Sequence, residues 1–589
     1  MLDTLPPEII YHIATFLPTV DALVHLAQTC QRLYKVVTAD DSRIFRAFVQ
    51  SRFPSIETPP LWRDAARVLT SRSRALDRRA LICRFVIPSS DVKRVGIQQS
   101  TRHDNPTLGY RPAIDSYEEW YGSHWASRRE VLVWSTGAEL AMRIRNPGDS
   151  RPHQWLTFND LDHISSYDDI CGVHLLRPEH PSKEVNKEHL IYGRARGDLV
   201  HIAISPQDGF HECKQRYINH TQVEMIDLSY GPDPILVTLR TNGSIAFFCT
   251  TTRSSEVHPS AVLGVDQGEI FRQKYVKFLS SDRIAVPQGV PTNSIPVYEV
   301  RPGQVSRIRE ISLDNLEISN SQRAVKAHVR ALAPLNLTGQ VPGTPGDLFL
   351  VGWGDGRIRL HDLRSRKPYE KEFIDTIDTS PTYSIHPFGH DRFLVGAGAG
   401  GVVKIFDLRM QNPYDRTCMD ADIIPLKKKS GRNDCINRTF PRKDFSIFLR
   451  HNHPPAAVNR GHRRGGRLNR SLNRYYSGPI YSMSSPSPSS ATVYAGVLDG
   501  IFRLDFASSD DLTGAHGRWY HDNLALDLNM KKSAPLDERI LEISGYERPG
   551  PETRGISPKL MVQKEFGDIT DKDVINEQNT GCDRRWERL

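Results

Sequence analysis

The chain has 589 residues and a formal net charge of +8, with 38% hydrophobic and 25% charged residues. Its apolar runs fall well short of the 18 or more residues of a membrane-spanning helix, and the N-terminus lacks the basic-then-apolar pattern of a secretory signal. These features argue against a membrane protein and a secreted one, and the abundance of Pro (39) and Gly (40) favours a turn-rich β fold. We therefore expect a cytoplasmic protein, a nuclear one, or one found in both compartments.

The first forty residues predict a small helical unit. Pro6, Pro7 and Glu8 suit the first turn of a helix, where backbone amides lack partners and negative charge is favoured. Apolar residues then recur at helical spacing until Pro18, and a second and a third helix are predicted from about Asp21. So short a segment buries little core by itself. We therefore expect its apolar faces to be covered by the rest of the chain or by a partner.

This stretch resembles an F-box. The resemblance rests on the Leu-Pro-x-Glu opening at 5–8, on the Leu-Pro at 17–18, and on Asp21, Arg32 and the apolar residues between them. Tyr34 stands where many F-boxes carry Trp. Membership of this family implies docking on the Skp adaptor of a cullin–RING ubiquitin ligase; the alternative is an ordinary helical cap on the following domain. The adaptor-binding residues implied by the resemblance are Leu5, Pro6, Glu8, Ile9, Ile13, Leu17, Leu23, Leu26, Cys30, Leu33 and Tyr34.

Residues 61–81 predict a further helical segment, which would connect the F-box to the rest of the chain. Several arginines lie along it, and we expect them to form a solvated face. The candidate buried positions are Trp62, Ala66, Leu69, Leu76 and Ala80.

Glycine-centred hairpins recur along the remaining sequence. Gly396, Gly398 and Gly401 spell G-x-G-x-x-G, but β-branched and aromatic residues follow them where a dinucleotide site needs a helix. We therefore predict a strand–turn–strand hairpin over 393–410 and no nucleotide site. Further hairpins are predicted at Gly197, Asn242-Gly243, Asp355-Gly356 and Asp499-Gly500, with less regular ones near Val131 and Val300.

The strand position five residues after each turn glycine recurs at intervals whose shortest values are 45, 46 and 50 residues. This is close to the length of a four-stranded propeller blade. "HDLRS" at 361–365 and "FDLRM" at 406–410 also resemble the Trp-Asp ending of WD repeats, with Trp replaced. We predict a degenerate WD-like β-propeller of about seven blades; six or eight blades are also compatible, and the alternative is a pair of β-sandwiches or a mixed β array. The repeated positions are 134, 202, 248, 298, 361, 406 and 505, those at 134 and 298 being the looser matches.

The predicted fold class is α+β multidomain, with a small all-α F-box followed by an all-β propeller. We expect the F-box at 1–50, a helical connector at 51–80 and the propeller at 81–545. A basic inserted loop is expected at 411–477, and a partly disordered C-terminal tail at 546–589.

The positive charge of the chain is local. Residues 427–474 hold fourteen Lys and Arg against Asp434 and Asp444, a charge of +12, which leaves −4 for the rest. A solvated insertion between two blades is the favoured interpretation, and a nuclear-import signal or a nucleic-acid contact are the alternatives. Few aromatic residues are interleaved with the basic ones, which argues against nucleic acid.

No motif indicates catalysis. The nearest two of the eight cysteines are 17 residues apart, so the closely spaced ligand pairs of structural zinc sites are missing, and neither G-x-S-x-G nor a phosphate-binding loop occurs. We expect no enzyme activity, metal or cofactor.

The favoured function is substrate recognition in an SCF-type (Skp–cullin–F-box) ubiquitin ligase. The expected partners are the Skp adaptor, a cullin bound through it, and a protein substrate held by propeller residues that the sequence does not identify. The competing function is a non-degradative WD-type scaffold. A third possibility is a propeller enzyme, which would need polar residues converging on one site, and the sequence alone does not identify such a set.

Overall fold

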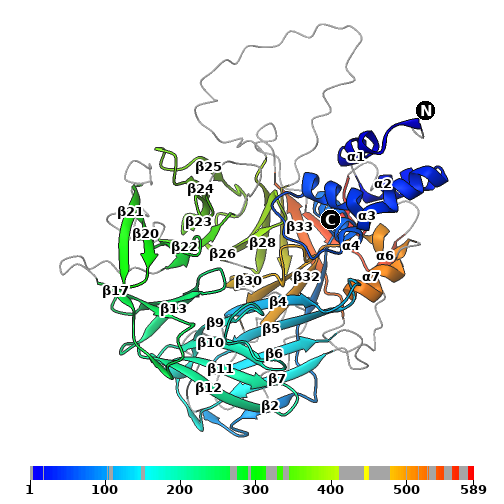
Figure 1. The fold of residues 1–589 in the computed structure, drawn as a ribbon. Helices are drawn as coiled ribbons and strands as arrows, with labels where there is room; N and C mark the ends of the chain where they lie inside the picture. Colours follow the sequence, from blue (N-terminus) through cyan, green and yellow to red (C-terminus); the bar gives the residue numbers. More distant parts are fainter. Residues whose placement is uncertain are drawn as a thin grey trace.

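The computed structural model describes most of the chain. The described residues are 4–17, 19–102, 104, 111–146, 153–264, 275–288, 294–312, 328–335, 344–398, 400–409, 444–449, 478–498, 500–514, 517–526, 528, 539–548, 560–569 and 581–588. Helices come first in the chain and strands follow, as the sequence predicts. The helices lie to one side of a ring of sheets (Figure 1).

Four helices precede the first strand. They are α1 (Pro7–Thr15), α2 (Val20–Gln28), α3 (Gln31–Arg52) and α4 (Trp62–Arg78). The predicted connector helix corresponds to α4, whereas α3 runs across the boundary expected at residue 50. Two short helices, α6 (Ser509–Thr513) and α7 (Gly517–Leu524), follow the seventh blade.

The described strands form seven sheets of four to seven strands, and a two-stranded ribbon of β3 (Thr101–Arg102) and β8 (His163–Ile164). We number these sheets as blades 1–7 in the chain order of their innermost strands. Blade 1 contains β4 (Ile114–Trp120), β5 (Arg128–Thr136), β6 (Glu139–Arg145), β7 (Gln154–Asn159) and β2 (Lys93–Gly96). Blade 2 contains β9 (Ile170–Leu175), β10 (Glu188–Arg194), β11 (Leu199–Ser205), β12 (Phe210–Tyr217) and β16 (Glu256–Val257).

Blades 3–5 have four strands each. Blade 3 contains β13 (Val223–Leu228), β14 (Ile235–Arg240), β15 (Ile245–Cys249) and β17 (Ala261–Leu263). Blade 4 contains β18 (Lys277–Phe278), β19 (Arg283–Ala285), β20 (Ser294–Arg301) and β21 (Gln304–Ser312). Blade 5 contains β22 (Val329–Pro334), β23 (Leu348–Trp353), β24 (Ile358–Asp362) and β25 (Lys371–Phe373).

The last two blades combine strands from distant parts of the chain. Blade 6 contains β26 (Thr382–Phe388), β27 (Arg392–Ala397), β28 (Val402–Asp407), β29 (Phe445–Leu449), β33 (Ile543–Glu547), β34 (Leu560–Gln563) and β35 (Trp586–Arg588). Blade 7 contains β30 (Ser482–Ser484), β31 (Thr492–Val497), β32 (Gly500–Asp505) and the N-terminal β1 (Ile82–Phe85).

The blades close into a ring. The first strand of each blade contacts the next blade in order, and β30 of blade 7 contacts β4 of blade 1. Closure is reinforced by β1, which precedes blade 1 in the chain but pairs antiparallel with β32. The predicted propeller of about seven blades is confirmed. Each of the seven repeated positions lies in a different blade, six on the third strand and residue 134 on the second.

The hairpin predicted over 393–410 is confirmed. Strands β27 and β28 pair antiparallel, and Gly400 takes a φ of +71° in the turn between them. Gly396 has a different role, because a β-carbon there would lie 2.6 Å from the carbonyl oxygen of Ile480, just before the first strand of blade 7. The glycines are therefore used for a turn and for close blade packing.

Two boundaries differ from those expected from sequence. Residues 445–449, inside the expected inserted loop, form β29, the fourth strand of blade 6, and Phe445, Ile447 and Leu449 are buried. The segment 427–474 as a whole is therefore not an insertion. Its remaining residues, apart from Asp444, lie outside the described residues, so the three interpretations of their charge stay predictions.

The second difference concerns the expected tail at 546–589. Strand β34 pairs with β33, and β35 pairs with β34, so parts of this region extend the sheet of blade 6. Both strands are only three or four residues long, too short for an alternating apolar pattern to show in sequence.

Replacing Gly396 should test the close packing of blades 6 and 7. We expect Gly396→Ala to lower the free energy of unfolding by about 1–3 kcal/mol, because the added methyl group would overpack against backbone that cannot move easily. Gly567→Ala is the control, since a β-carbon there meets no atom within 4 Å. Thermal unfolding of both variants measures the difference, and equal midpoints would contradict the packing role.

Candidate protein-docking surface

Local sequence fixes the ends of the first three helices. Pro7 occupies the first turn of α1 and Glu8 lies beside its unpaired amides. The Thr19 side chain accepts a hydrogen bond from the Ala22 amide at the start of α2, and the Cys30 sulfur accepts one from the Leu33 amide at the start of α3. These caps set where each helix begins, and thereby which residues face inward.

Helices α1, α2 and α3 share one hydrophobic core, and α4 contributes residues to it. Leu23 is 0% exposed and Leu33 is 2% exposed within this core. The expectation that the rest of the chain or a partner covers the apolar faces of residues 1–40 is met for these two leucines by the rest of the chain, because residues 44–69 complete their core. Neither leucine is accessible to a partner in this conformation.

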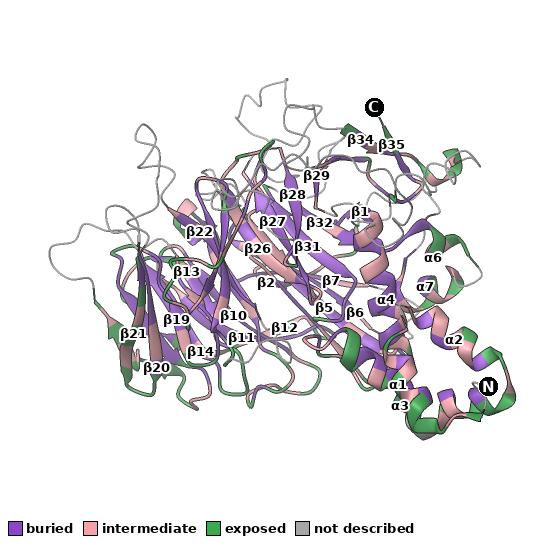
Figure 2. Cartoon of the chain, turned by 90° about the horizontal axis from the view of Figure 1, so that it is seen from above, coloured by how far each residue is buried: buried purple, intermediate pink, exposed green. Residues whose placement is uncertain are grey.

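The opposite side of α1 leaves apolar side chains exposed. Ile9 is 46% exposed and Phe16 is 72% exposed, and Ile13 between them is half-buried. Residues at spacings of four and seven share one face of a helix, so these three side chains form a single apolar stripe. His12 contributes to it, with its ring 5.0 Å from that of Phe16. In Figure 2 the helices α1–α3 project from the body of the molecule with much of their outer surface exposed.

The remaining predicted residues divide into two groups. Pro6, Glu8 and Tyr34 are exposed, and Tyr34 is 58% exposed near the start of α3. Partly buried side chains that pack against the helical core are Leu5, Leu17, Leu26 and Cys30. The accessible part of the predicted set is therefore smaller than the sequence implies, and it centres on the outer face of α1. The set does not include Phe16, the most exposed apolar residue of this region, although its spacing of seven from Ile9 was a usable signal.

Helix α4 joins the helical domain to the propeller by packing on three sides. Ala66 and Leu69 belong to the core of α1–α3. Ala65 and Val68 pack with Trp125 and helix α7. At the C-terminal end, Ala75, Leu76 and Ala80 enter the core formed by blades 6 and 7.

Arg63 of α4 is exposed, but the other arginines of this helix are buried or half-buried rather than on the solvated face expected from sequence. Arg72 is 2% exposed, and its Nη1 donates to the carbonyl oxygens of Pro488 and Ser490 at 2.7 and 2.8 Å. Burial, opposed in part by the nearby charges of Asp391 and Glu118, lowers the pKa of Arg72 to about 10. Because Pro488 and Ser490 lie between the first and second strands of blade 7, α4 sits on that end of the propeller.

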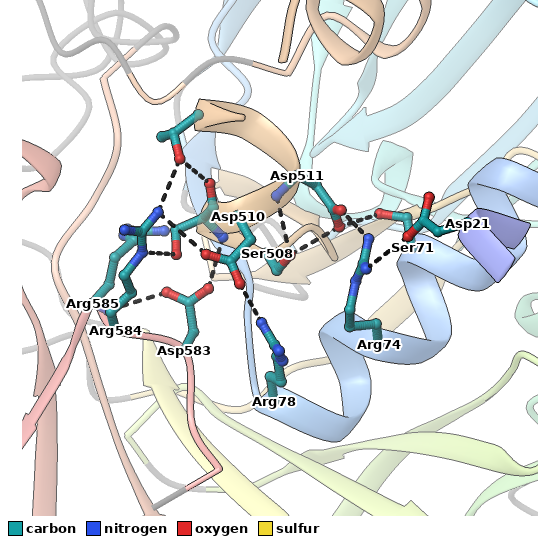
Figure 3. A network of polar contacts seen from close by, with 12 residues as sticks. Asp21, Ser71, Arg74, Arg78, Ser508, Asp510, Asp511, Asp583, Arg584 and Arg585 are labelled. Carbon is teal, nitrogen blue, oxygen red and sulfur yellow. Dashed lines mark hydrogen bonds and ion pairs between the residues drawn. The ribbon is translucent and has the colours of Figure 1, made fainter. Parts of the chain in front are cut away.

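A network of charges fastens α4 to the segment after blade 7 (Figure 3). Asp511 accepts hydrogen bonds from Ser71 and Ser508 at 2.7 and 2.8 Å and forms an ion pair with Arg74. Arg74 also reaches Asp21 of α2 at 3.4 Å. The same side chain thus contacts the helical domain and the propeller side.

The C-terminal segment covers the end of α4. The Asp583 amide donates to the Arg78 carbonyl at 2.8 Å, and the Trp586 indole donates to the Arg79 carbonyl at 2.8 Å. Arg585 and Gln563 both donate to the carbonyl of Leu81. Carbonyls at and just beyond a helix C-terminus lack partners within the helix, and here residues about 500 positions away supply them.

Two kinds of feature are absent from the described residues. None of the helices among them is long and apolar enough to cross a membrane. Within those same ranges, His, Cys, Asp and Glu do not gather in groups of three or more that could hold a metal ion.

Comparison with known proteins assigns the helical domain to a class. The family described as F-box-like matches residues 2–50, so the chain contains an F-box-like domain followed by a WD-like propeller. Small ribosomal subunit protein RACK1 of Schizosaccharomyces pombe is 26% identical over 103 residues, 18% of this chain, and the match spans only about a third (31%) of that protein. Saccharomyces cerevisiae Sqt1, a crystal structure, aligns over 64% of this chain and 80% of its own with 14% identity and a TM-score of 0.36.

Removal of Arg74 should loosen α4 on the propeller. We expect Arg74→Ala to lower the free energy of unfolding by about 1–3 kcal/mol, since Asp511 would stay buried without its cation. Faster cleavage of the chain between α3 and α4 in limited proteolysis would report the loosening. Arg63→Ala, at an exposed position of the same helix, is the matched control. Identical cleavage rates for both variants would show that the network does not hold the helix.

Proposed function

We propose that the protein is the substrate-recognition subunit of an SCF-type ubiquitin ligase. The observation that carries the proposal is the F-box-like domain at residues 2–50, whose folded core leaves one apolar face of α1 uncovered. An exposed stripe containing Ile9 and Phe16 would bury its area on a partner, and the Skp adaptor is the partner that F-box resemblance implies. Pro6 and Glu8 border the stripe and would contribute to its rim.

The propeller supplies a second surface, at the end away from α4. Helix α4 contacts loops between first and second strands, so the opposite end carries the turns between second and third strands, such as those at Gly197 and Gly356. Arg111 and Arg330 are positioned at this end over the rings of Tyr481 and Tyr383, each at 5.0 Å. We propose that a protein substrate binds there, distant from the adaptor.

In the proposed role, the protein acts by bringing a substrate close to the conjugating enzyme. A receptor that holds adaptor and substrate on one rigid body raises the effective concentration of the substrate near the conjugating enzyme, and no chemical step falls to the receptor itself. The network around Arg74 and Asp511 supports this, because it fixes the helical domain relative to the propeller. Action in the cytoplasm, the nucleus or both fits this role and stays a prediction.

Co-purification tests the assignment. Full-length protein expressed in cells should recover a Skp-family adaptor and a cullin. Recovery of propeller-bound proteins without adaptor or cullin would instead favour the non-degradative scaffold. Proteins that accumulate on the receptor when the cullin is inhibited are the candidate substrates.

Substitution of the exposed stripe should separate docking from folding. We expect Ile9→Ala with Phe16→Ala to weaken adaptor binding about 10–100-fold while changing stability by less than about 0.5 kcal/mol, because both side chains are exposed in the free protein. Leu23→Ala should instead lower the stability of the helical domain by about 2–5 kcal/mol, since it removes core volume.

Binding to purified adaptor by calorimetry and thermal unfolding measure the two effects. Phe210→Ala is the matched control, an exposed aromatic residue on blade 2 that is 61% exposed. Full adaptor affinity in the Ile9→Ala, Phe16→Ala variant would rule out the α1 face as the docking surface.

A further inference from the structure

Four side chains form a continuous series of contacts at the propeller end away from α4. The Cζ atom of Arg330, in blade 5, lies 5.0 Å from the centre of the Tyr383 ring in blade 6. That ring is 5.7 Å from the ring of Tyr481, which precedes the first strand of blade 7, and stands nearly perpendicular to it. The Cζ atom of Arg111, just before the first strand of blade 1, lies 5.0 Å from the centre of the Tyr481 ring. We call these four residues the Arg–Tyr row.

Two β-bulges place the blade 5 and blade 6 members of the row. Arg330 is the extra residue where the pairing of β22 with β23 shifts register. Tyr383 is the extra residue at the corresponding shift between β26 and β27. A bulge redirects a side chain out of the regular alternation of a strand, and bulges are common beside functional sites. The same irregularity in two neighbouring blades therefore brings a cation and an aromatic ring together at one end of the propeller.

The two arginines of the row have no acidic partner. Among the residues that the structure describes, neither Arg111 nor Arg330 forms a hydrogen bond or an ion pair. By contrast, Arg357 and Arg359, also of blade 5, pair with Glu372 at 2.9 and 3.0 Å. The row therefore carries two positive charges that no described carboxylate compensates.

Both guanidinium groups can still be reached by an acceptor. Arg111 is exposed and Arg330 is half-buried. The Nε atom of Arg330 is buried, so its Nη atoms are the ones left for a ligand. A guanidinium that stacks on an aromatic ring uses its face for that contact and keeps the N–H groups of its edge for acceptors. The tyrosine rings thus hold the two cations in place without using their hydrogen-bond donors.

We propose that the Arg–Tyr row binds an acidic segment of the protein substrate through two carboxylates, one on each arginine. The inference rests on the proposed function and names the chemistry of the substrate. A carboxylate matches the two-pronged donor geometry of a guanidinium group. An apolar side chain between the two acidic residues would pack on the tyrosine rings. The steps along the row are 5.0–5.7 Å, and an extended chain advances about 3.3 Å per residue, so the acidic residues lie no more than about five positions apart.

Carboxylates suit the row better than a phosphate group. A phosphorylated serine carries a charge of about −1.5 to −2 and three acceptor oxygens, which several converging cations match best. Here the two cations come from blades 5 and 1, with blades 6 and 7 between them, and each lies over a different ring. One single charge at each position fits this arrangement. Recognition of the substrate would then require no prior phosphorylation.

Binding of labelled peptides to the full-length protein tests the proposal. The peptides carry two glutamates around a central leucine, and the spacing of the glutamates is varied. We expect the tightest binding at spacings of about three to five positions, and about tenfold weaker binding when both glutamates are replaced by glutamine. Added salt should weaken binding of the glutamate peptides and leave that of the glutamine peptides nearly unchanged. Equal affinity for the two series would overturn the proposal.

A third series of peptides distinguishes carboxylate from phosphate. One glutamate is replaced by phosphoserine at the best spacing. We expect this peptide to bind no more tightly than the one with two glutamates, because a single arginine faces each position. Clearly tighter binding of the phosphoserine peptide would overturn the choice of carboxylates and identify a phosphorylated segment instead.

Substitution of the arginines locates the binding site. We expect Arg111→Gln and Arg330→Gln together to weaken binding of the glutamate peptides about 10–100-fold and to leave Tm nearly unchanged, because neither side chain has a charged partner to lose. Lysine at both positions keeps the charge without the two-pronged geometry and should give intermediate affinity. Arg301→Gln is the matched control, a blade 4 arginine whose side chain is 66% exposed. Unaltered peptide affinity in the Arg111→Gln, Arg330→Gln variant would rule out the row.

Adaptor binding separates this inference from the proposed function. The row lies on the propeller and the apolar stripe on α1, so the variant with both arginines replaced should bind the adaptor with full affinity. Recovery of adaptor and cullin without binding of the glutamate peptides would overturn the row and leave the receptor role standing. Peptide binding without adaptor or cullin would support the row and count against the ubiquitin-ligase role.

Discussion

Helix α4 is buried on several sides at once, and the arrangement of the whole molecule depends on that burial. One side of it completes the core of the F-box-like domain through Ala66 and Leu69. Another enters the propeller through Ala75 and Leu76. Each apolar side chain removed from water contributes on the order of 1–3 kcal/mol, so two cores that share one helix are stabilised together. The helical domain is therefore held in a defined orientation relative to the propeller. In sequence, only short segments connect α3 to α4 and α4 to β1.

Charged side chains restrict this apolar contact to one geometry. Apolar burial alone tolerates sliding, whereas a buried carboxylate such as Asp511 needs donors at particular positions. Ser71, Arg74 and Ser508 supply them from two distant parts of the chain. Arg72 acts similarly by binding two carbonyl oxygens of blade 7. These contacts specify one seating of α4 among those that the apolar surfaces would permit.

The first and the last strand of the chain both lie beside the same helix. Strand β1, directly after α4, closes blade 7, and β35 near the C-terminus completes the outer edge of blade 6. The C-terminal segment then pairs the free carbonyls at the end of α4. A propeller must bring the start and the end of its chain together, and here the point of closure is also the point where the helical domain is attached. Surfaces at opposite ends of one closed ring keep a fixed separation, which the proposed receptor role would require.

Local sequence determined the features that depend on neighbouring residues. The turn glycines and alternating strands identified the hairpins, because positive φ and a two-residue period are local properties. The order of Leu5, Pro6 and Glu8 identified the F-box-like domain, which the family match at 2–50 confirms. The seven recurring hairpin positions indicated about seven blades, with six or eight also compatible.

Only the tertiary structure decided how distant segments combine. An amphipathic pattern shows that Leu23 and Leu33 are apolar but not whether a partner or the chain itself covers them; the chain does. The arginines of α4 look solvated in sequence, yet Arg72 is buried because carbonyl oxygens more than 400 positions away accept its hydrogen bonds. Strands β29 and β35 are short, and their identity comes from the strands beside them rather than from their own residues. Sequence fixes local geometry because its causes are local; burial and charge compensation depend on neighbours that only the folded chain brings into contact.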